Sequence, residues 1–419
     1  MKCQPVFFFA VLMVFSAGSI WANEDKILDE VQRRTFCYFW EQSHPRSGLI
    51  RERSSTPHTT TIGGTGFQLM ALIVGDKRGY ASRQKVLGRL SKILNSLERS
   101  PRYHGVFPHW IDGQNDKTKP FSKYDNGADL VETALLVQGL LCVRQYLKGN
   151  ESVDRAIRKK ADSLWRAVDW QFFTRNKNAL YWHWSPNYGW KMNLPISGWN
   201  EALIAYVLAA SSPTHPISPE VYHYGWARLG KMKNGKLYCG IKLPLGPPYG
   251  GPLFLSHYSF LGLDPRGLRD RYADYWQQNV NHTLINWSHC MKKGYGPAWG
   301  LTSSDTPKGY AAHSPTEDRG VITPTAALSA IVYTPQKSMK ALQHFKKTMD
   351  GRLYGPLGFV DAYQPRSGWI AKDQLAIDQG PIIIMIENYR SGLFWKLFMS
   401  CPEIIKGLQR LGFERVTNE

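Results

Sequence analysis

Helical periodicity recurs along the whole chain, and it constrains the fold more than any other feature of the sequence. Apolar residues return at spacings of three and four, whereas the strict alternation typical of half-buried strands is rare. Proline marks two helix starts, in Thr323-Pro324 and Gly380-Pro381. The pattern predicts helices over residues 25–43, 64–74, 82–98, 128–147, 152–173, 199–211, 217–229, 252–261, 268–291, 324–331, 336–348, 380–398 and 402–411.

These helices follow one another without a visible domain boundary. No linker rich in proline, serine or glycine interrupts them, and no low-complexity tract does. Short repeats of the TPR or ankyrin type are also absent, which disfavours an open solenoid. We therefore expect residues 23–419 to form one all-α domain. Its expected architecture is an (α/α)6 toroid, a double ring of about twelve helices in which alternate helices line the centre.

The first 22 residues have the layout of a secretory signal. Lys2 precedes an apolar stretch from Val6 to Phe15, and small residues follow through Ala22. We expect cleavage near Asn23 and a periplasmic or secreted protein. No later window reaches the roughly 20 apolar residues of a membrane span. The remaining cysteines are odd in number, so we expect free thiols and no disulfide framework.

The net charge of +19 raises the question of a nucleic-acid partner. The basic residues are scattered, however, and the densest groups, at 155–160 and 344–347, lack the interleaved aromatic residues of RNA-binding patterns. We therefore expect no nucleic-acid partner and a monomeric protein.

Aromatic residues are more informative than charge. The chain has 15 Trp, 21 Tyr and 18 Phe, and several lie in connections rich in Gly, Pro and Asn. Examples are "FPHWIDG" (107–113), "YWHWSPNYGW" (181–190) and "GYGPAWGL" (294–301). Flat rings in loops suit the apolar faces of sugars, which indicates a carbohydrate ligand. For any single ring, packing that anchors the loop is an equally open alternative.

Three carboxylates gather in "DNGADLVETALLVQGLL" (125–141). On a continuous helix Asp125, Asp129 and Glu132 would lie within a sector of about 60°. Apolar residues occupy the rest of the surface, so we expect the acids to face inward at the start of the helix. Capping and the helix dipole offer a structural explanation, which accounts for Asp125 and Asp129 more readily than for the third acid.

Two more acids begin apolar segments. Glu201 follows Trp199 and Asn200 in "SGWNEALIAYVLAA", where loss of hydration should raise its pKa. A raised pKa suits a general acid, although a first-turn Glu is also favoured by the dipole alone. Asp378 stands just before the apolar part of "LAIDQGPIIIMIENYRSG". It is either a helix cap or a functional acid. In the same segment the spacing of Glu387 and Arg390 predicts an ion pair.

Glycoside hydrolases usually have two carboxyl groups, which flank the glycosidic bond that is cleaved. The sequence has no HExxH, Walker, GxSxG or EF-hand motif. A hard-oxygen metal site at Asp125, Asp129 and Glu132 is a less favoured alternative. We therefore expect an enzyme without a metal or other cofactor.

At these residues the sequence resembles glycoside hydrolase family 144, the bacterial endo-β-1,2-glucanase family within the group named putative glucoamylases. The resemblance covers nearly all of residues 23–419. The stretches that carry it are "TFCYFWEQSHPRSGLIRER" (35–53), "FPHWIDG", "DNGADLVETALLVQGLL", "YWHWSPN", "GWNEALIAYVLAASSPTHPI" (198–217), "GGPLFLSHYSFLGLDPRGL" (250–268), "WGLTSSD" (299–305), "GVITPTAALSAIVYTP" (320–335) and "LAIDQGPIIIMIENYRSGL" (375–393).

The resemblance implies an (α/α)6 barrel and an anomer-inverting hydrolase that cleaves linear β-1,2-glucan to sophorooligosaccharides without a cofactor. The match of "GWNEAL" implies that Glu201 is the general acid. The match of "DNGADLVET" implies that Asp125, Asp129 and Glu132 are acids of the cleft, while the identity of the general base stays open. Related enzymes include exo-acting members that release disaccharides, and transglycosylating domains.

The leading hypothesis is an endo-acting β-1,2-glucanase whose catalytic acids are Glu201 with Asp125, Asp129, Glu132 and Asp378. An exo-acting enzyme that releases sophorose, or a non-catalytic glucan-binding protein, is the alternative. Two groups of side chains are expected to bind the sugar: Trp110, Trp184, Trp190, Trp199 and Trp299 by stacking, and Asn200, His257, Tyr258 and Asp305 by hydrogen bonds to hydroxyls.

Overall fold

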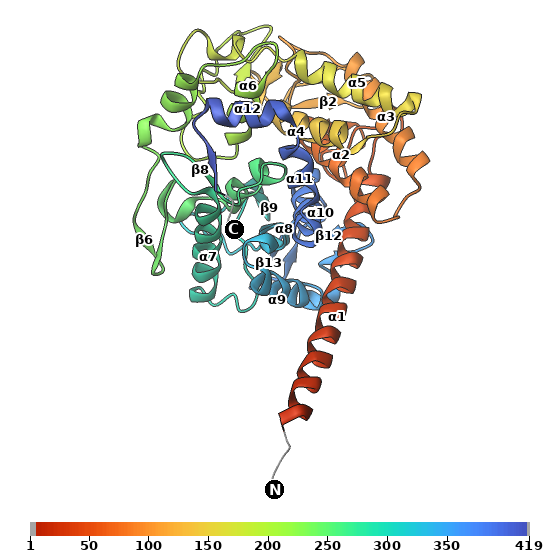
Figure 1. The fold of residues 1–419 in the computed structure, drawn as a ribbon, viewed down its shortest axis with the longest axis vertical. Helices are drawn as coiled ribbons and strands as arrows, with labels where there is room; N and C mark the ends of the chain where they lie inside the picture. The colour runs from red at the N-terminus through yellow and green to blue at the C-terminus, as the bar shows by residue number, and fades with distance from the viewer. Residues whose placement is uncertain (1–5, 417–419) are drawn as a thin grey trace.

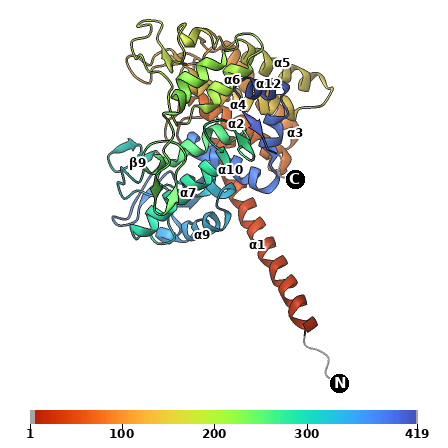
Figure 2. The same ribbon diagram turned by 60° about the vertical axis from the view of Figure 1, so that its left-hand side comes forward.

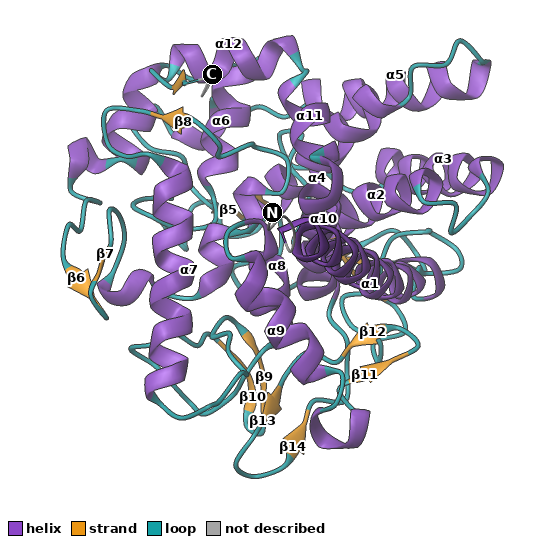
Figure 3. Ribbon diagram, turned by 60° about the horizontal axis from the view of Figure 1, so that its bottom comes forward, coloured by secondary structure: helices purple, strands orange, loops and turns teal. Residues whose placement is uncertain are grey.

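The computed structural model describes residues 6–416, with side chains from Glu24 onward, and helices dominate it (Figures 1 and 3). The helices are α1 (Val6–Glu41), α2 (Ile62–Lys77), α3 (Arg83–Arg99), α4 (Leu130–Tyr146), α5 (Ser152–Arg166), α6 (Leu203–Ser211), α7 (Tyr275–Lys292), α8 (Pro324–Ser329), α9 (Pro335–Phe345), α10 (Ala376–Ser391), α11 (Leu393–Met399) and α12 (Pro402–Arg410). The prediction of a mostly helical protein is confirmed.

The strands are only two or three residues long and pair antiparallel in small hairpins or bridges. They are β1 (Thr59–Thr61), β2 (Trp110–Asp112), β3 (Thr118–Lys119), β4 (Ala128–Asp129), β5 (His183–Trp184), β6 (Leu237–Tyr238), β7 (Ile241–Lys242), β8 (Leu268–Arg269), β9 (Ser304–Thr306), β10 (Gly309–Ala311), β11 (Tyr354–Gly355), β12 (Gly358–Phe359), β13 (Tyr363–Gln364), β14 (Trp369–Ile370) and β15 (Glu414–Arg415). They connect the helices and form no large sheet.

Two kinds of helix alternate along the chain. Helices α2, α4, α6, α8 and α10 are buried over nearly their whole surface, whereas α3, α5, α7 and α9 bury one face. A helix that is apolar all round belongs in the interior, and a one-sided helix belongs outside. Accordingly α2 packs against α4 and α10, while α4 also contacts α6 and α10 also contacts α8.

Glycines allow α2 and α4 to approach closely. A Cβ atom on Gly66 would lie 2.3 Å from the carbonyl oxygen of Leu135, and one on Gly139 would lie 2.2 Å from that of Gly66. Only glycine permits such backbone contact. The crossing places the start of α4, with its acids, beside the start of α2.

Helix α1 projects from the body of the molecule toward the N-terminus (Figures 1 and 2). It continues through residues 6–22 of the predicted leader, and residues 1–5 lie outside the described part. The cleavage site therefore stays a prediction. None of the described helices is both long enough and apolar enough to cross a membrane.

Several predicted helices have different limits. The helix predicted over 152–173 ends at Arg166, and the segments 217–229 and 252–261 form short π and 3-10 turns. Helix α7 begins at Tyr275 because Asp274 caps it, accepting a hydrogen bond from the backbone N–H of Gln277.

The starts of α6 and α10 also differ from the prediction. Helix α6 begins at Leu203, so that Glu201 lies in the preceding turn. Helix α10 begins at Ala376, and Pro381 therefore lies inside it, where the prediction placed a helix start. The left-handed backbone of Gly392, with φ of 66°, separates α10 from α11.

The cysteines within the described residues form no disulfide, as predicted; Cys3 lies outside that part. The free thiols are Cys37, Cys142, Cys239, Cys290 and Cys401.

Candidate active site

A cavity of about 410 Å³ opens beside the N-terminal ends of α2, α4 and α10 and the turn before α6. Five of its lining residues were predicted as site residues: Trp110, Asp129, Glu132, Glu201 and Tyr258. The full lining is Glu52, Arg53, Thr61, His109, Trp110, Phe121, Asp129, Val131, Glu132, Leu135, Trp182, Glu201, Phe254, Tyr258, Ser303, Tyr310, Leu375 and Ile377. The predicted convergence of Glu201 with Asp129 and Glu132 is therefore present, whereas Asp125 does not line the cavity.

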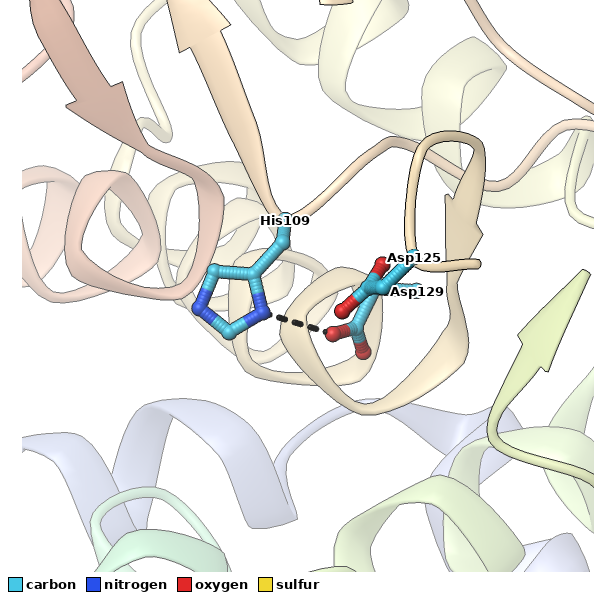
Figure 4. Close-up of side chains that lie close together, drawn as sticks. All are labelled: His109, Asp125 and Asp129. Atoms are coloured by element: carbon cyan, nitrogen blue, oxygen red, sulfur yellow. Dashed lines mark hydrogen bonds and ion pairs between the residues drawn. The ribbon is translucent and has the colours of Figure 1, made fainter. Parts of the chain in front are cut away.

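Asp129 is the N-cap of α4. Its Oδ1 accepts hydrogen bonds from the backbone N–H groups of Val131 and Glu132 and from the indole N–H of Trp182, each at 3.0 Å. Its Oδ2 lies 2.8 Å from Nδ1 of His109 (Figure 4). Burial opposes ionisation, but the bonds to His109 and His183 hold the pKa of Asp129 well below its usual range. Asp129 is therefore ionised at neutral pH.

Two histidines supply positive charge to the acids. His183 Nε2 lies 3.3 Å from Oδ2 of Asp125 and 3.5 Å from Oδ2 of Asp129. Burial disfavours the charged ring, but these two partners raise the pKa of His183 to about 10. Burial likewise opposes the charge on His109, while Glu132 and the bond to Asp129 raise its pKa to about 9. Two imidazolium groups therefore offset the repulsion among the clustered carboxylates.

The predicted helix face does not bring the acids together. Asp125 and Asp129 both precede α4, and Asp129 pairs with His183 in the short β4–β5 ladder. That pairing brings the histidine to both aspartates. The convergence depends on a cap and a strand pair, which a helical-wheel argument cannot represent.

Glu132 belongs to the first turn of α4 and contacts the start of α2. Its Oε2 accepts hydrogen bonds from the backbone N–H of Gly63 at 2.7 Å and from the hydroxyl of Thr61 at 3.2 Å. Its Oε1 has no hydrogen-bond partner among the described residues. Burial raises the pKa of Glu132, and the charge of Asp129 adds to this effect while that of His109 opposes it.

Glu201 presents a carboxyl group to the same cavity from the turn before α6. The hydroxyl of Ser259 fixes this turn, since it donates to the Glu201 carbonyl and accepts the backbone N–H of Ile204. Burial raises the pKa of Glu201 to about 7, and the charges of Asp129 and Glu132 contribute to the rise. Within the described residues no side chain is hydrogen-bonded to its carboxyl. The group can therefore carry and release a proton near neutral pH.

A second group of acids lies behind another wall of the cavity. Arg53 donates to both oxygens of Glu52, at 2.8 and 3.0 Å, and to Asp305 at 3.1 Å. The backbone N–H of Asp305 donates to Asp361 at 2.6 Å, and Asp361 lies close enough to Asp378 for its charge to add to burial in raising the pKa of that group. Asp378 is only 2% exposed. Asp305 and Asp378 thus support the cavity wall and do not line it.

Of the predicted stacking residues, only Trp110 lines the cavity. Trp184 and Trp190 pack around Phe172, with ring centroids 5.8 and 5.2 Å from it. Trp199 is buried against Phe260, and Trp299 is fully buried in the core. These four rings have structural contacts of the kind that the packing alternative describes.

Of the residues predicted to bind sugar hydroxyls, some line the cavity and others do not. Tyr258 lines the cavity, whereas His257 is buried and its ring is 6.3 Å from that of Tyr333. The side-chain oxygen of Asn200 accepts the backbone N–H of Ala202, so that it caps the turn carrying Glu201.

The prediction from sequence omitted His109 and His183, the partners of the acids. His109 directly precedes Trp110 in "FPHWIDG", and His183 stands between two tryptophans in "YWHWSPN"; both segments were singled out for their tryptophans. A histidine in each of two loops, together with clustered acids, is the signal that could have indicated them. Arg53, Phe121 and Tyr310 carried no comparable signal, because nothing in the local pattern places them near the acids.

One group of side chains has the spacing of metal ligands. Candidate ligand atoms of His109, Asp125 and Asp129 lie within 4.8 Å of one another (Figure 4). Both oxygens of Asp129 already accept hydrogen bonds, however, and the raised pKa of His109 keeps its Nδ1 protonated and donating. A metal needs deprotonated ligands. The donor set therefore fits an ion-paired cluster better than a metal centre.

Comparisons with known proteins identify the relatives of the chain. Residues 193–402 match the model of the putative glucoamylase family, and residues 30–133 match a family of unknown function, DUF3131. A curated relative is the exo β-1,2-glucooligosaccharide sophorohydrolase (non-reducing end) of Parabacteroides distasonis, which is 40% identical over 94% of this chain. The alignment covers 59% of that protein, so this chain spans about three-fifths of its length.

Solved structures extend the likeness over the whole fold. A putative glucoamylase from Bacteroides uniformis is 52% identical with a TM-score of 0.92, covering 94% of this chain and 98% of that one. The endo-β-1,2-glucanase of Chitinophaga pinensis, solved with sophorotriose and glucose, is 51% identical with a TM-score of 0.91, covering 93% and 98%. The chain therefore belongs to the putative glucoamylase family and, within it, to glycoside hydrolase family 144.

Proposed function

We propose that the protein hydrolyses β-1,2-glucan with inversion at the anomeric carbon. The observation that carries the proposal is the carboxyl of Glu201, which faces the cavity with a pKa of about 7 beside the ionised Asp129. Glu201 donates a proton to the oxygen of the leaving glucose unit. Two carboxyl groups with separated pKa values are what such a reaction needs.

The attacking water requires a base on the opposite side of the sugar. Glu132 is our candidate because it lines the cavity and its Oε1 has no hydrogen-bond partner among the described residues. Asp129 has both oxygens occupied, so its role is to hold negative charge near the oxocarbenium-like transition state. His109 and His183 keep that charge in place.

We infer the (α/α)6 toroid from the alternation of fully buried and one-sided helices. The buried segment 252–263, which packs against α6, takes the place of a sixth inner helix. We also propose export, on the basis of the leader-like residues 1–22. Mass spectrometry of the mature chain from a periplasmic fraction should give an N-terminus near Asn23, and an intact Met1 would contradict export through this leader.

We favour endo cleavage because the Chitinophaga pinensis endo-β-1,2-glucanase is 51% identical over nearly the full length of both chains. Exo cleavage is the second candidate, supported by the 40% identical sophorohydrolase. A product time course on linear β-1,2-glucan distinguishes the two. An early mixed ladder of oligosaccharides supports endo cleavage, whereas sophorose as the sole early product supports exo cleavage. Absence of any release would overturn the proposed function.

A further inference from the structure

A chain of charged contacts links three segments at one wall of the cavity. The loop residue Arg53 is held on one side by Glu52 and on the other by Asp305 of β9. Asp305 pairs in register with Tyr310 of β10, whose half-exposed ring lines the cavity. Asp361 then anchors this hairpin from behind, accepting the backbone N–H of Asp305 at 2.6 Å.

Asp361 and Asp378 are a buried pair of like groups. Asp361 is 1% exposed and Asp378 is 2% exposed, and they lie close enough for the charge of Asp361 to add to burial in raising the pKa of Asp378. One oxygen of each, Oδ1 of Asp361 and Oδ2 of Asp378, is buried without a partner among the described residues. Two neighbouring ionised carboxylates buried in this way would repel, and the arrangement is favourable only when they share one proton.

The surroundings offer little other charge to stabilise two anions. Glu52 and Asp305 face the pair with negative charge, and Arg53 is the cation that acts on Asp361. Tyr258 and Tyr310 face Asp378 across the wall, and the nearby groups Tyr38 and Asp373 add no positive charge. Arg53 is moreover already shared between Glu52 and Asp305.

We propose that Asp361 is a positioning residue: through the proton that it shares with Asp378, it fixes the β9–β10 hairpin and so holds Tyr310 and Arg53 at the cavity wall. The inference rests on the proposed function, since it assigns these two side chains to substrate binding. Burial raises the pKa of Asp361 to about 7 and that of Asp378 well above its usual range. The contact is intact at acidic pH and is lost as pH rises through the folded-state values.

Two substitutions of Asp361 distinguish the effect of the shared proton from the effect of the side chain as a whole. Asp361→Asn keeps an oxygen that can accept the Asp305 N–H, and its amide can donate to Asp378 at every pH. Asp361→Ala removes both contacts. Asp264→Asn is the matched control, because Asp264 is also buried but pairs with Arg266 outside this network.

The experiment measures KM and kcat on linear β-1,2-glucan between about pH 6 and about pH 9. Loss of a hydrogen bond to a charged group corresponds to about a tenfold change or more. We therefore expect KM of the wild type and of Asp264→Asn to rise about tenfold toward alkaline pH. KM of Asp361→Asn stays low throughout, and KM of Asp361→Ala is high throughout. All four proteins should show the same fall in kcat at alkaline pH, because Glu201 loses its proton in each of them.

A wild-type KM that does not change with pH, or an Asp361→Asn KM that rises in parallel with it, would overturn the inference. Amide exchange of residues 303–311, compared at a single pH near 6, gives a readout independent of activity. We expect the exchange to be faster in Asp361→Ala than in the wild type, and unchanged in Asp361→Asn. Equal exchange in all of these proteins would contradict the positioning role, whereas failure of the wild type to cleave the glucan would reject only the proposed function.

Discussion

At the residue scale, the central feature is the separation of charge states among neighbouring carboxyl groups. Asp129 accepts three N–H hydrogen bonds on one oxygen and pairs with histidine on the other, so it stays ionised. Glu201 lacks such partners and loses hydration at the cavity, so its pKa rises. Two carboxyl groups in one cavity thus differ in charge: Asp129 is an anion, and Glu201 is a proton donor.

Glu201→Gln should remove the proton donor while leaving the shape of the cavity unchanged. Because general acid catalysis contributes about 10²- to 10⁴-fold, we expect kcat on β-1,2-glucan to fall by that factor with KM nearly unchanged. Glu317→Gln, on an exposed loop, is the control and should behave as the wild type. A Glu201→Gln enzyme with wild-type kcat would show that another group donates the proton.

The dependence of kcat on pH tests the role of Glu201 as the proton donor. Glu201 must be protonated to act, and its folded-state pKa is about 7. The alkaline limb of the kcat profile should therefore fall as pH rises through about 7, whereas protonation of the base sets the acid limb. A kcat profile that stays flat to pH of about 9 would contradict the role of Glu201.

His183→Asn should destabilise the fold, because it leaves Asp125 and Asp129 buried without their shared cation. We expect a loss of about 3 kcal/mol in the free energy of unfolding at neutral pH, measured by urea titration. The folded pKa of about 10 lies above the ordinary histidine value of 6.5, so this stabilisation is complete below about pH 6.5 and is lost as pH rises through 10. The difference between variant and wild type should therefore shrink at alkaline pH, and the exposed His58→Asn should show neither effect.

At the element scale, the crossing of α2 and α4 sets the position of the acids. Gly66→Ala would place a methyl group against the backbone of Leu135, so we expect a loss of about 1–3 kcal/mol in the free energy of unfolding. Gly88→Ala is the matched control on α3, where the new methyl group contacts nothing within 4 Å. Since alanine favours a helix interior, that variant should be about 0.5–1 kcal/mol more stable. Equal stability of the two variants would refute the close crossing.

The helices could be predicted where burial follows the helical period. In α3 the buried residues Val86, Leu90 and Leu97 recur at that spacing, and the predicted limits differ from the observed ones by one residue. The apolar segment 252–261 was equally periodic, but its 3-10 turns follow the Gly- and Pro-rich stretch at 246–252. Local pattern cannot tell these cases apart, because packing decides them.

Ion pairs were predicted less well than helices. Glu387 binds Arg78, the C-cap residue of α2, at 2.8 Å, and Arg390 binds Asp25 and Asp29 of α1, so the predicted pair between Glu387 and Arg390 is wrong. Helical spacing makes such a pair possible, but partners from other helices compete for the same charges. His183 was missed for the same reason, since only the fold brings it to Asp125.

At the scale of the whole molecule, the cavity is built from segments that lie far apart in the sequence. Its lining residues extend from Glu52 to Ile377 and come from α4, α10 and the connections between the helices. The sequence could indicate the acids and the helical class, since each depends on neighbouring residues. The sequence could not indicate which aromatic rings face the cavity: four of the five predicted tryptophans pack elsewhere.

The central claim is inverting hydrolysis of β-1,2-glucan at the Glu201 cavity, and the anomeric form of the first products tests it most directly. Proton NMR recorded during digestion of linear β-1,2-glucan should show the α-anomer of the new reducing ends before mutarotation, and Glu201→Gln should nearly abolish that signal. Initial release of the β-anomer, or no release at all, would contradict the account.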